Sequence, residues 1–213
     1  MIHYLIRNAD CIVAVKPPET VSERTPDGTG FCDRLAAENP GFLEPVYRLD
    51  RGVGGVILYA RTPQSAAYFS AQVREHALKK EYTAVLCGAP PADTGELRDL
   101  LYFDRAKNKS YVVKSPRKGV KEAVLSYRVT DRWTDPATGA PRTCVSVRLQ
   151  TGRTHQIRVQ FASRGLPLLG DRRYGGAPDP AGKAISLWCR SVTLPGTEAL
   201  VCEPPWSRSG SSS

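Results

Sequence analysis

Short apolar runs separated by polar and glycine-rich segments dominate the first third of the chain, and their lengths are those of strands. Residues 11–15 and 55–60 are apolar and bounded by turn-forming residues, so each predicts a buried strand. Residues 19–30 carry Glu, Ser, Thr, Asp, Pro and Gly and predict a loop. A short helix is expected over residues 31–38, because Asn39-Pro40-Gly41 would end it.

One segment has the period of an amphipathic helix. Thr62 is a favourable N-cap, and Pro63 is favourable at the first helical position. The buried face is expected at i, i+3, i+4, i+7 spacing, on Ala66, Phe69, Ser70, Val73 and Ala77. Lys79 and Lys80 would suit the C-terminal end of this helix, where cations are favoured. Residues 81–87 then predict a strand.

Strand signals also prevail in the second half of the chain. Residues 124–129 and 144–149 predict strands flanking the turn-rich TDPATGAPR, which favours a hairpin. Residues 92–121 are polar and basic and predict an insertion of hairpins or loops over the main sheet. Residues 184–194 predict a last strand or pair of strands.

A second, shorter helix is expected to begin at Arg153-Thr154, with Ile157 and Phe161 on its apolar face and Gly165 at its end. Together the elements predict an α+β fold on a mixed sheet. A chain of 213 residues can bury a sizeable core, and we expect one domain over residues 1–206. The SRSGSSS segment, residues 207–213, has nothing to bury and predicts a disordered tail.

The net charge of +9 is concentrated in two places. Residues 105–121 hold seven Lys or Arg and no acid, and residues 142–173 hold seven arginines against one acid, Asp171. Such patches favour a polyanion, because each phosphate neutralised releases counterions. Nucleic acid is the leading candidate, and a membrane partner is disfavoured because no basic amphipathic helix is present. Basic charge serving solubility alone is the alternative.

Several site classes are not supported. The six cysteines are scattered, whereas zinc and redox sites use short spacings, so buried reduced thiols are expected and no metal. The nucleotide motifs GxGxxG and GxxxxGK[ST] are absent, so no nucleotide cofactor is expected. No stretch reaches the roughly 18 apolar residues of a membrane helix. The N-terminal residues lack a signal-peptide pattern, and a cytoplasmic monomer is expected.

Two polar segments are candidates for chemistry. Asp50 lies between Arg48 and Arg51, and neighbouring cations favour the ionised carboxylate, which suits a nucleophile better than a general acid. An ordinary turn salt bridge is the alternative. Arg153 follows a glycine and begins a basic segment, and its side chain could pair with Asp50. His155 and Arg158 in the same segment could bind phosphates.

The alternative for the basic segment is a solvated helix face. His155 has no carboxylate cluster beside it in the sequence, so a hydrogen-bonding structural role is favoured over catalysis or metal binding. The glycine-rich stretch at residues 165–175 indicates an ordered loop after the helix.

In this order the segments closely resemble the RluA family of RNA pseudouridine synthases. The family pattern His-Arg-Leu-Asp followed by Thr-Ser-Gly corresponds to Tyr-Arg-Leu-Asp-Arg-Gly-Val-Gly-Gly at residues 47–55. Its Lys-x-Tyr-x-Ala strand is matched at residues 80–84, and its Gly-Lys-x-Ala strand is echoed at residues 120–123. The most specific match is Thr-Gly-Arg-Thr-His-Gln-Ile-Arg at residues 151–158, followed by Gly-x-Pro-x-x-Gly-Asp-x-x-Tyr-Gly at residues 165–175.

The resemblance spans about residues 10–195 and implies a mixed, largely antiparallel sheet with flanking helices and a central basic cleft. It implies a single catalytic domain without the S4 domain of many members, acting on tRNA or rRNA without cofactor, metal or energy source. The implied reaction breaks the uridine N-glycosidic bond, turns the base and joins C1′ to C5. The base must be flipped out, because stacked RNA shields C1′.

The resemblance also implies roles for individual residues. Asp50 would be the nucleophile acting at or near C1′, Arg153 its ionic partner, and Tyr82 a stacking group that takes part in proton removal. Arg48 would fill the space left by the flipped base. Ile185 and Leu187 would pack near the flipped base itself. The residues expected to bind substrate RNA are Arg48, Thr151, His155, Gln156, Arg158, Ile185 and Leu187.

The chain departs from the family pattern at three places. Tyr47 replaces the usual histidine, Val53-Gly54-Gly55 replaces Thr-Ser-Gly, and Gln160 stands where histidine is frequent. None of these departures removes Asp50, Tyr82 or Arg153. An RNA-binding or chaperone protein on the same fold, with catalysis lost or incidental, is the alternative, and retention of these three residues argues against it. A glycosidase is disfavoured, because it needs a second carboxylate opposite the first.

Overall fold

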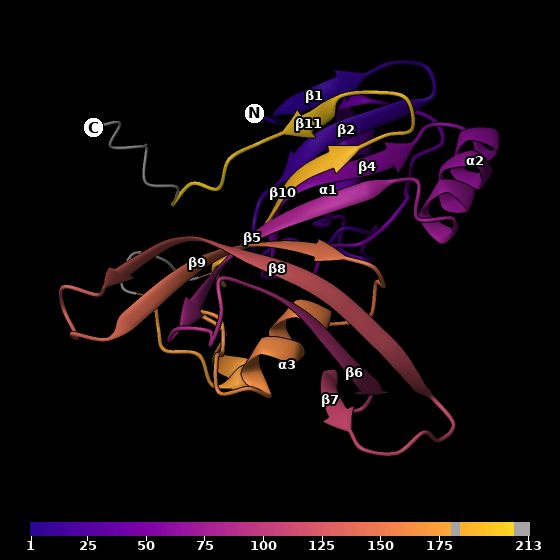
Figure 1. The fold of residues 1–213 in the computed structure, drawn as a ribbon. Coiled ribbons are helices and arrows are strands. Elements are labelled where there is room, and N and C mark those ends of the chain that lie inside the picture. The colour runs from indigo at the N-terminus through magenta and orange to yellow at the C-terminus, as the bar shows by residue number, and fades with distance from the viewer. Residues whose placement is uncertain (180–183, 207–213) are drawn as a thin grey trace. The chain divides into compact units, whose positions relative to one another are not determined.

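The computed structural model describes residues 1–179 and 184–206, so the predicted disorder of residues 207–213 lies outside the described residues. The chain forms two compact units (Figure 1). Unit 1 comprises residues 1–80 together with the chain from residue 188 onward, and unit 2 comprises residues 81–187. The expectation of one catalytic domain over residues 1–206 stays a prediction.

The sheet of unit 1 is mixed. In Figure 1, β4 lies between β2 and β10, and the order β1-β2-β4-β10 has antiparallel pairs except for the parallel pair of β4 and β10. Its strands are β1 (Tyr4–Arg7), β2 (Cys11–Lys16), β3 (Glu44–Pro45), β4 (Gly54–Ala60), β10 (Leu187–Thr193) and β11 (Ala199–Val201). Both predicted strands, β2 and β4, are confirmed, and every residue of β4 is buried.

Two helices belong to unit 1, α1 (Phe31–Glu38) and α2 (Pro63–Arg74). The predicted cap of α2 is confirmed, because the Thr62 side chain accepts a hydrogen bond from the Ser65 N–H at 3.0 Å. The predicted end is wrong: His76 has a φ of 56°, which turns the chain out of the helix before the two lysines. Lys79 and Lys80 instead begin β5 (Lys79–Cys87).

The buried face of α2 is narrower than predicted. Phe69 is buried as expected and Ser65 is buried beside it, whereas Ala66, Ser70 and Val73 are half-buried. Ala77 lies beyond the end of the helix. The helix α2 therefore has two buried side chains, Ser65 and Phe69, which lie one helical turn apart.

The sheet of unit 2 is antiparallel throughout, in the order β5-β9-β8-β6-β7. Its further strands are β6 (Thr94–Asp104), β7 (Lys109–Val113), β8 (Val120–Thr134) and β9 (Pro141–Leu149). The predicted hairpin of β8 and β9 is confirmed. The predicted insertion over the sheet is wrong, because β6 pairs with β8 from Thr94 to Tyr102 and so extends the sheet itself.

The helix α3 (Gln156–Ala162) packs against β6 and β7, and the 3₁₀ turn η1 (Arg172–Tyr174) follows it. It begins three residues later than predicted, because His155 adopts a left-handed backbone with a φ of 55°. Ile157 and Phe161 are buried as predicted. Gly165 follows the helix with a φ of 74°, and its N–H donates to the Ala162 carbonyl.

The fold class is confirmed as α+β with a mixed, mostly antiparallel sheet. No helix within residues 1–179 and 184–206 is both long and apolar enough to cross a membrane.

Candidate active site

The Asp50 turn precedes β4, and its backbone is fixed from inside unit 1. The Asp50 carbonyl accepts a hydrogen bond from the Val53 N–H at 2.9 Å. On the other side, the buried Ser22 hydroxyl accepts from the Leu49 N–H and donates to the Leu49 carbonyl, each at 3.0 Å. The Tyr59 hydroxyl in turn donates to the Ser22 carbonyl at 2.6 Å. The carboxylate is therefore carried by a turn with little freedom to move.

Lys16 provides a second tie to this turn. Its side chain is 0% exposed, and Nζ donates to the carbonyls of Pro17 at 3.0 Å, Thr20 at 2.6 Å and Arg51 at 3.4 Å. Burial lowers the pKa of Lys16 to about 8, and the negative charge of Asp50 is the largest opposing effect. Buried lysines need such partners. Lys16 thus links β2 to the Asp50 turn and places a cation near its carboxylate.

We predict that Lys16 makes stability rise with pH in the alkaline range. The folded pKa of about 8 lies below the ordinary value of 10.5, so the unfolded chain binds more protons between these pH values. The free energy of unfolding from this group therefore rises from pH 8 to pH 10.5, by at most about 3 kcal/mol. Urea unfolding of the wild type and Lys16→Met at pH 7 to 10 measures it. A difference between the two proteins that does not change with pH would contradict the prediction.

The arginines that flank Asp50 have carboxylate partners in the preceding loop. Arg48 is 70% exposed in its side chain, and Nη1 lies 2.8 Å from Oε1 of Glu23. Arg51 is similarly exposed, with Nε 3.7 Å from Oε2 of Glu19. The guanidinium of Arg48 is therefore held at the surface, where it is accessible to solvent.

Tyr47, which replaces the histidine of the family pattern, is buried and used structurally. Its hydroxyl donates to the Val56 carbonyl at 3.0 Å. The Lys80 ammonium lies 4.3 Å from the centre of its ring, in a cation–π contact. Burial lowers the pKa of Lys80. Tyr47 thus connects the segment before Asp50 to β4 through this hydrogen bond.

Gly54 stands where the family pattern has serine, and the structure gives a steric reason for the glycine. Gly54 pairs with Trp188 in the parallel register of β4 and β10, and a Cβ on Gly54 would lie 2.3 Å from Cζ3 of the indole. Trp188 is held there by a 2.8 Å hydrogen bond from Nε1 to the Cys202 carbonyl and by an edge-on contact with Trp206. At Gly55, which matches the family, φ is 118° and a Cβ would meet backbone. Trp188 therefore fills the volume that a serine at position 54 would need.

The Arg153 loop belongs to unit 2 and is tied to β8. The Arg153 backbone N–H donates to Oε1 of Gln156 and its Nε donates to the Glu122 carbonyl, each at 2.9 Å. The Thr151 hydroxyl donates to the same Gln156 oxygen at 2.9 Å, and Nε2 of Gln156 donates to the Val124 carbonyl at 3.1 Å. Thr151 and Gln156, predicted to bind substrate, thus shape the loop that presents Arg153.

His155, at the N-cap of α3, and Arg158, within α3, are both buried. Nδ1 of His155 lies 3.0 Å from the Tyr174 hydroxyl, which is the structural hydrogen bond favoured from sequence. Arg158 makes a two-bond ion pair with the buried Asp171, at 2.7 and 2.9 Å, and lies over the Tyr174 ring. This geometry favours a role for Arg158 in fixing the loop after α3 rather than in contacting phosphate.

Tyr82 lies on β5, and Ile185 and Leu187 belong to the segment that leads into β10. Tyr82 lies on β5 opposite Val147 and is 6% exposed. Residues 185–187 run beside β5, because the Val85 N–H donates to the Ser186 carbonyl at 3.0 Å. The predicted strand over residues 184–194 begins only at Leu187. The expected pairing of Arg153 with Asp50 stays a prediction.

Sequence reasoning missed Lys16 and Ser22, which bond to the backbone of Arg51 and Leu49, and Trp188, which packs on Gly54. A lysine at the end of a buried apolar run was the one available signal. Among the described residues, no group of three or more His, Cys, Asp or Glu side chains is placed to hold a metal ion.

Comparisons with known proteins agree with these motifs. The sequence model of the family described as RNA pseudouridylate synthase matches residues 10–163. The chain is 33% identical over 151 residues to "RNA pseudouridine synthase 2, chloroplastic" of Oryza sativa subsp. japonica, covering 70% of this chain and 32% of that protein. It is 34% identical over 149 residues to "Dual-specificity RNA pseudouridine synthase RluA" of Pasteurella multocida, covering 70% of this chain and 64% of that protein. The chain thus spans about a third of the length of the rice relative.

The solved structure "Human RNA Pseudouridylate Synthase Domain Containing 1" shares the fold, with a TM-score of 0.79 and 21% identity over 96% of this chain and 83% of that one. The resemblance found from the motifs is confirmed. Since the family model covers more than half of its residues, the chain belongs to the RNA pseudouridylate synthase family, as a member of the RluA type.

Proposed function

We propose that this protein is an active RNA pseudouridine synthase that isomerises specific uridines in structured tRNA or rRNA. The observation that carries the proposal is the Asp50 turn, whose backbone is held by Ser22 and by the buried Lys16. A protein that only bound RNA would need no such positioned carboxylate. The relatives' names, which include a dual-specificity enzyme and ribosomal large subunit enzymes, support an RNA substrate.

In the proposed reaction, Asp50 acts at or near C1′ of a flipped uridine while the bond from C1′ to N1 breaks. The freed uracil turns, its C5 forms the new bond to C1′, the proton on C5 leaves to water, and N1 takes up a proton. One C1′ bond breaks and one forms, and the proton lost at C5 is matched by the proton gained at N1, so the reaction needs no oxidant or reductant. In this proposal Arg153 supplies the positive charge that keeps Asp50 ionised. Arg48 fills the space that the base leaves.

The test is tritium release from RNA labelled with [5-³H]uridine, because the C5 proton is lost only when the new bond forms. We expect release from bulk tRNA or ribosomal RNA without added metal or nucleotide. Wild-type protein that binds both RNA pools but releases tritium from neither would favour the alternative, an RNA-binding or chaperone protein on this fold.

We predict that Tyr82→Phe keeps RNA binding but lowers tritium release by about 10²–10⁴-fold, the range for a lost proton-transfer group. The ring that would stack on the base remains, and only the hydroxyl is removed. Tyr82→Leu is the matched variant, and it should also weaken RNA binding by about 1–3 kcal/mol, since stacking is lost. Wild-type release by the Phe variant would assign Tyr82 to stacking alone.

The proposal places the protein in the cytoplasm as a monomer without membrane or nucleotide partners. All six cysteines are free thiols, and Cys11, Cys32 and Cys189 are buried. Free cysteines at this number are typical of a reducing compartment.

A further inference from the structure

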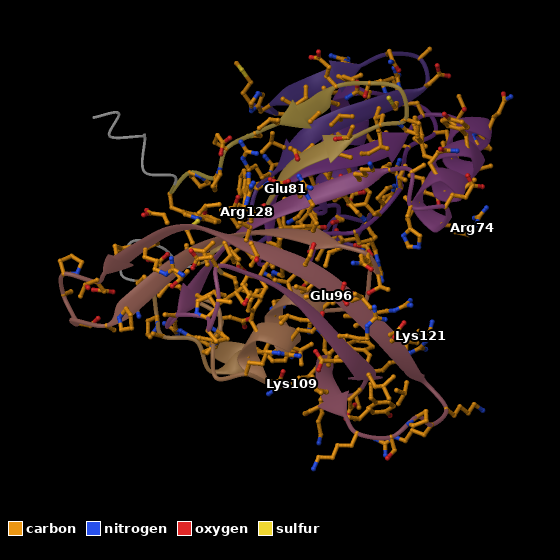
Figure 2. The ribbon with its side chains drawn as sticks, in the orientation of Figure 1. Arg74, Glu81, Glu96, Lys109, Lys121 and Arg128 are labelled. Carbon is orange, nitrogen blue, oxygen red and sulfur yellow. The ribbon has the colours of Figure 1, made fainter. Side chains whose placement is uncertain are left out.

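One end of unit 2 carries a concentration of exposed cations that the catalytic roles leave unused. We call it the cationic tip, and it is formed by the β6–β7 turn, the β7–β8 loop, the start of β8 and η1. Besides Arg105 and Arg172, it holds six exposed cations: Lys107, Lys114, Arg117, Lys118, Lys121 and Arg173. Figure 2 labels Lys121, near the start of β8, and Lys109, at the start of β7 next to the β6–β7 turn. The tip is therefore a compact positive surface and not a dispersed charge.

The tip is not neutralised by the protein. Residues 105–121 contain no acid. The two acids that border this stretch have other partners: Oδ1 of Asp104 accepts from the Lys107 backbone N–H at 3.1 Å, and Glu122 pairs with Arg98 at 2.8 Å. Within the part of the chain that the structure describes, none of the six cations forms an ion pair with a carboxylate. Unpaired surface cations in one patch raise the local potential and attract anions.

The backbone under the tip is ordered. β6 and β7 pair from Leu100 to Asp104, and Nη1 of Arg173 donates to the carbonyls of Lys107 at 3.0 Å and Asn108 at 2.8 Å. The Arg117 guanidinium lies over the Tyr102 ring, 4.9 Å from its centre. Because the supporting backbone is fixed in the free protein, an anion bound here would cost little additional ordering.

The tip is also joined to the Arg153 loop. The Ser110 hydroxyl on β7 donates to the Thr154 carbonyl at 2.6 Å, directly after Arg153. Nε of Arg153 donates to the Glu122 carbonyl, directly after Lys121. An RNA strand that reaches Arg153 therefore has the tip as an adjoining surface in the same unit.

We propose that the cationic tip binds the phosphodiester backbone of the substrate RNA beside the target uridine, and this inference rests on the proposed function. The tip presents ammonium and guanidinium groups and few groups that could read base edges, so its contribution is to affinity and orientation rather than to sequence choice. Among the described residues, no exposed large apolar side chain lies on the elements that form the tip, and Val112 on β7 lies beside them. A surface of exposed cations with few apolar side chains favours a polyanion as the binding partner over a protein with an apolar surface.

The test compares two double variants with equal charge. Lys114→Gln/Lys118→Gln removes two cations from the tip, and Arg74→Gln/Arg128→Gln removes two exposed cations elsewhere. Figure 2 labels both control residues, and Arg128 lies seven residues along β8 from Lys121, about 23 Å at the rise of a strand. Each double variant lowers the net charge from +9 to +7.

The measured quantity is the slope of log Kd against log salt concentration for labelled bulk tRNA. The slope should fall by about 1.5 in the tip variant, because each lost phosphate contact lowers it by about 0.7–0.9. The control variant should keep the wild-type slope. In tritium release, the tip variant should raise KM and keep kcat, since it loses uniform binding.

The outcomes separate this inference from the proposed function. Wild-type tritium release with equal slopes for tip and control variants would overturn the role of the tip and leave the function standing. A reduced slope in the tip variant, with no tritium release by the wild type from any RNA, would support the tip and overturn the function. Binding of the wild type to acidic polypeptide but not to tRNA would overturn both.

Discussion

Replacing Asp50 with asparagine should abolish tritium release from [5-³H]uridine-labelled RNA, by at least about a thousandfold, while RNA binding survives. The amide has the shape of the carboxylate but cannot act as an anionic nucleophile. The turn should persist, because the hydrogen bonds that hold it use the backbone of Asp50 and Leu49. The loss should therefore appear in kcat. Single-turnover release and filter binding to the same RNA measure the two effects.

Asp10→Asn is the matched control for this experiment, because Asp10 is an exposed aspartate in the same unit. It should release tritium at the wild-type rate. Retention of more than about a tenth of the rate by Asp50→Asn would contradict the nucleophile assignment, since a lost nucleophile costs far more. Thermal unfolding of both variants separates lost chemistry from lost folding.

The second large effect is expected at Gly54. In Gly54→Ser the new Cβ would lie 2.3 Å from the Trp188 ring, which is buried and anchored, so the strand or the indole must shift. Overpacking of this kind costs about 1–3 kcal/mol of unfolding free energy. Gly54 is four residues from Asp50, and a displacement of about 1 Å there would lower the rate by about a hundredfold. Urea unfolding and tritium release measure the two losses.

A double variant tests whether Trp188 is the cause. Trp188→Leu vacates the volume above Gly54, so adding it to Gly54→Ser should restore part of the activity that the serine removed. Trp188→Leu alone should lose stability through the cavity it leaves. If the double variant is no more active than Gly54→Ser, the contact with Trp188 is not what excludes a side chain at position 54. Ala67→Ser, at an exposed position of α2, controls for adding a hydroxyl.

Local signals explain which elements could be predicted from sequence. The strand β4 and the start of α2 follow from an apolar run and a Thr-Pro cap, which act within a few residues. The end of α2 and the start of α3 depend on left-handed backbones at His76 and His155, for which residue type gives a weak preference. The place of β6 in the sheet depends on its pairing with β8, a tertiary contact that polarity alone conceals.

In the candidate site, too, local sequence patterns could be predicted and tertiary contacts could not. The order of the motifs identified Asp50, Tyr82 and Arg153 as candidates, because each belongs to a contiguous pattern. The support of Asp50 could not be predicted, since Lys16 bonds to carbonyls of Thr20 and Arg51 that only folding brings together. The pairing of Gly54 with Trp188 is likewise set by the register of two distant strands.

The indole above Gly54 also gives the protein an optical property. Of the three tryptophans, Trp188 and Trp206 lie together in unit 1 with their ring centres 5.9 Å apart, and Trp133 lies on β8 of unit 2. With Trp133→Phe, the tryptophan emission would come only from this pair, in which Trp188 packs on Gly54. Fluorescence of that protein would then follow movement of the turn in real time, without any attached dye.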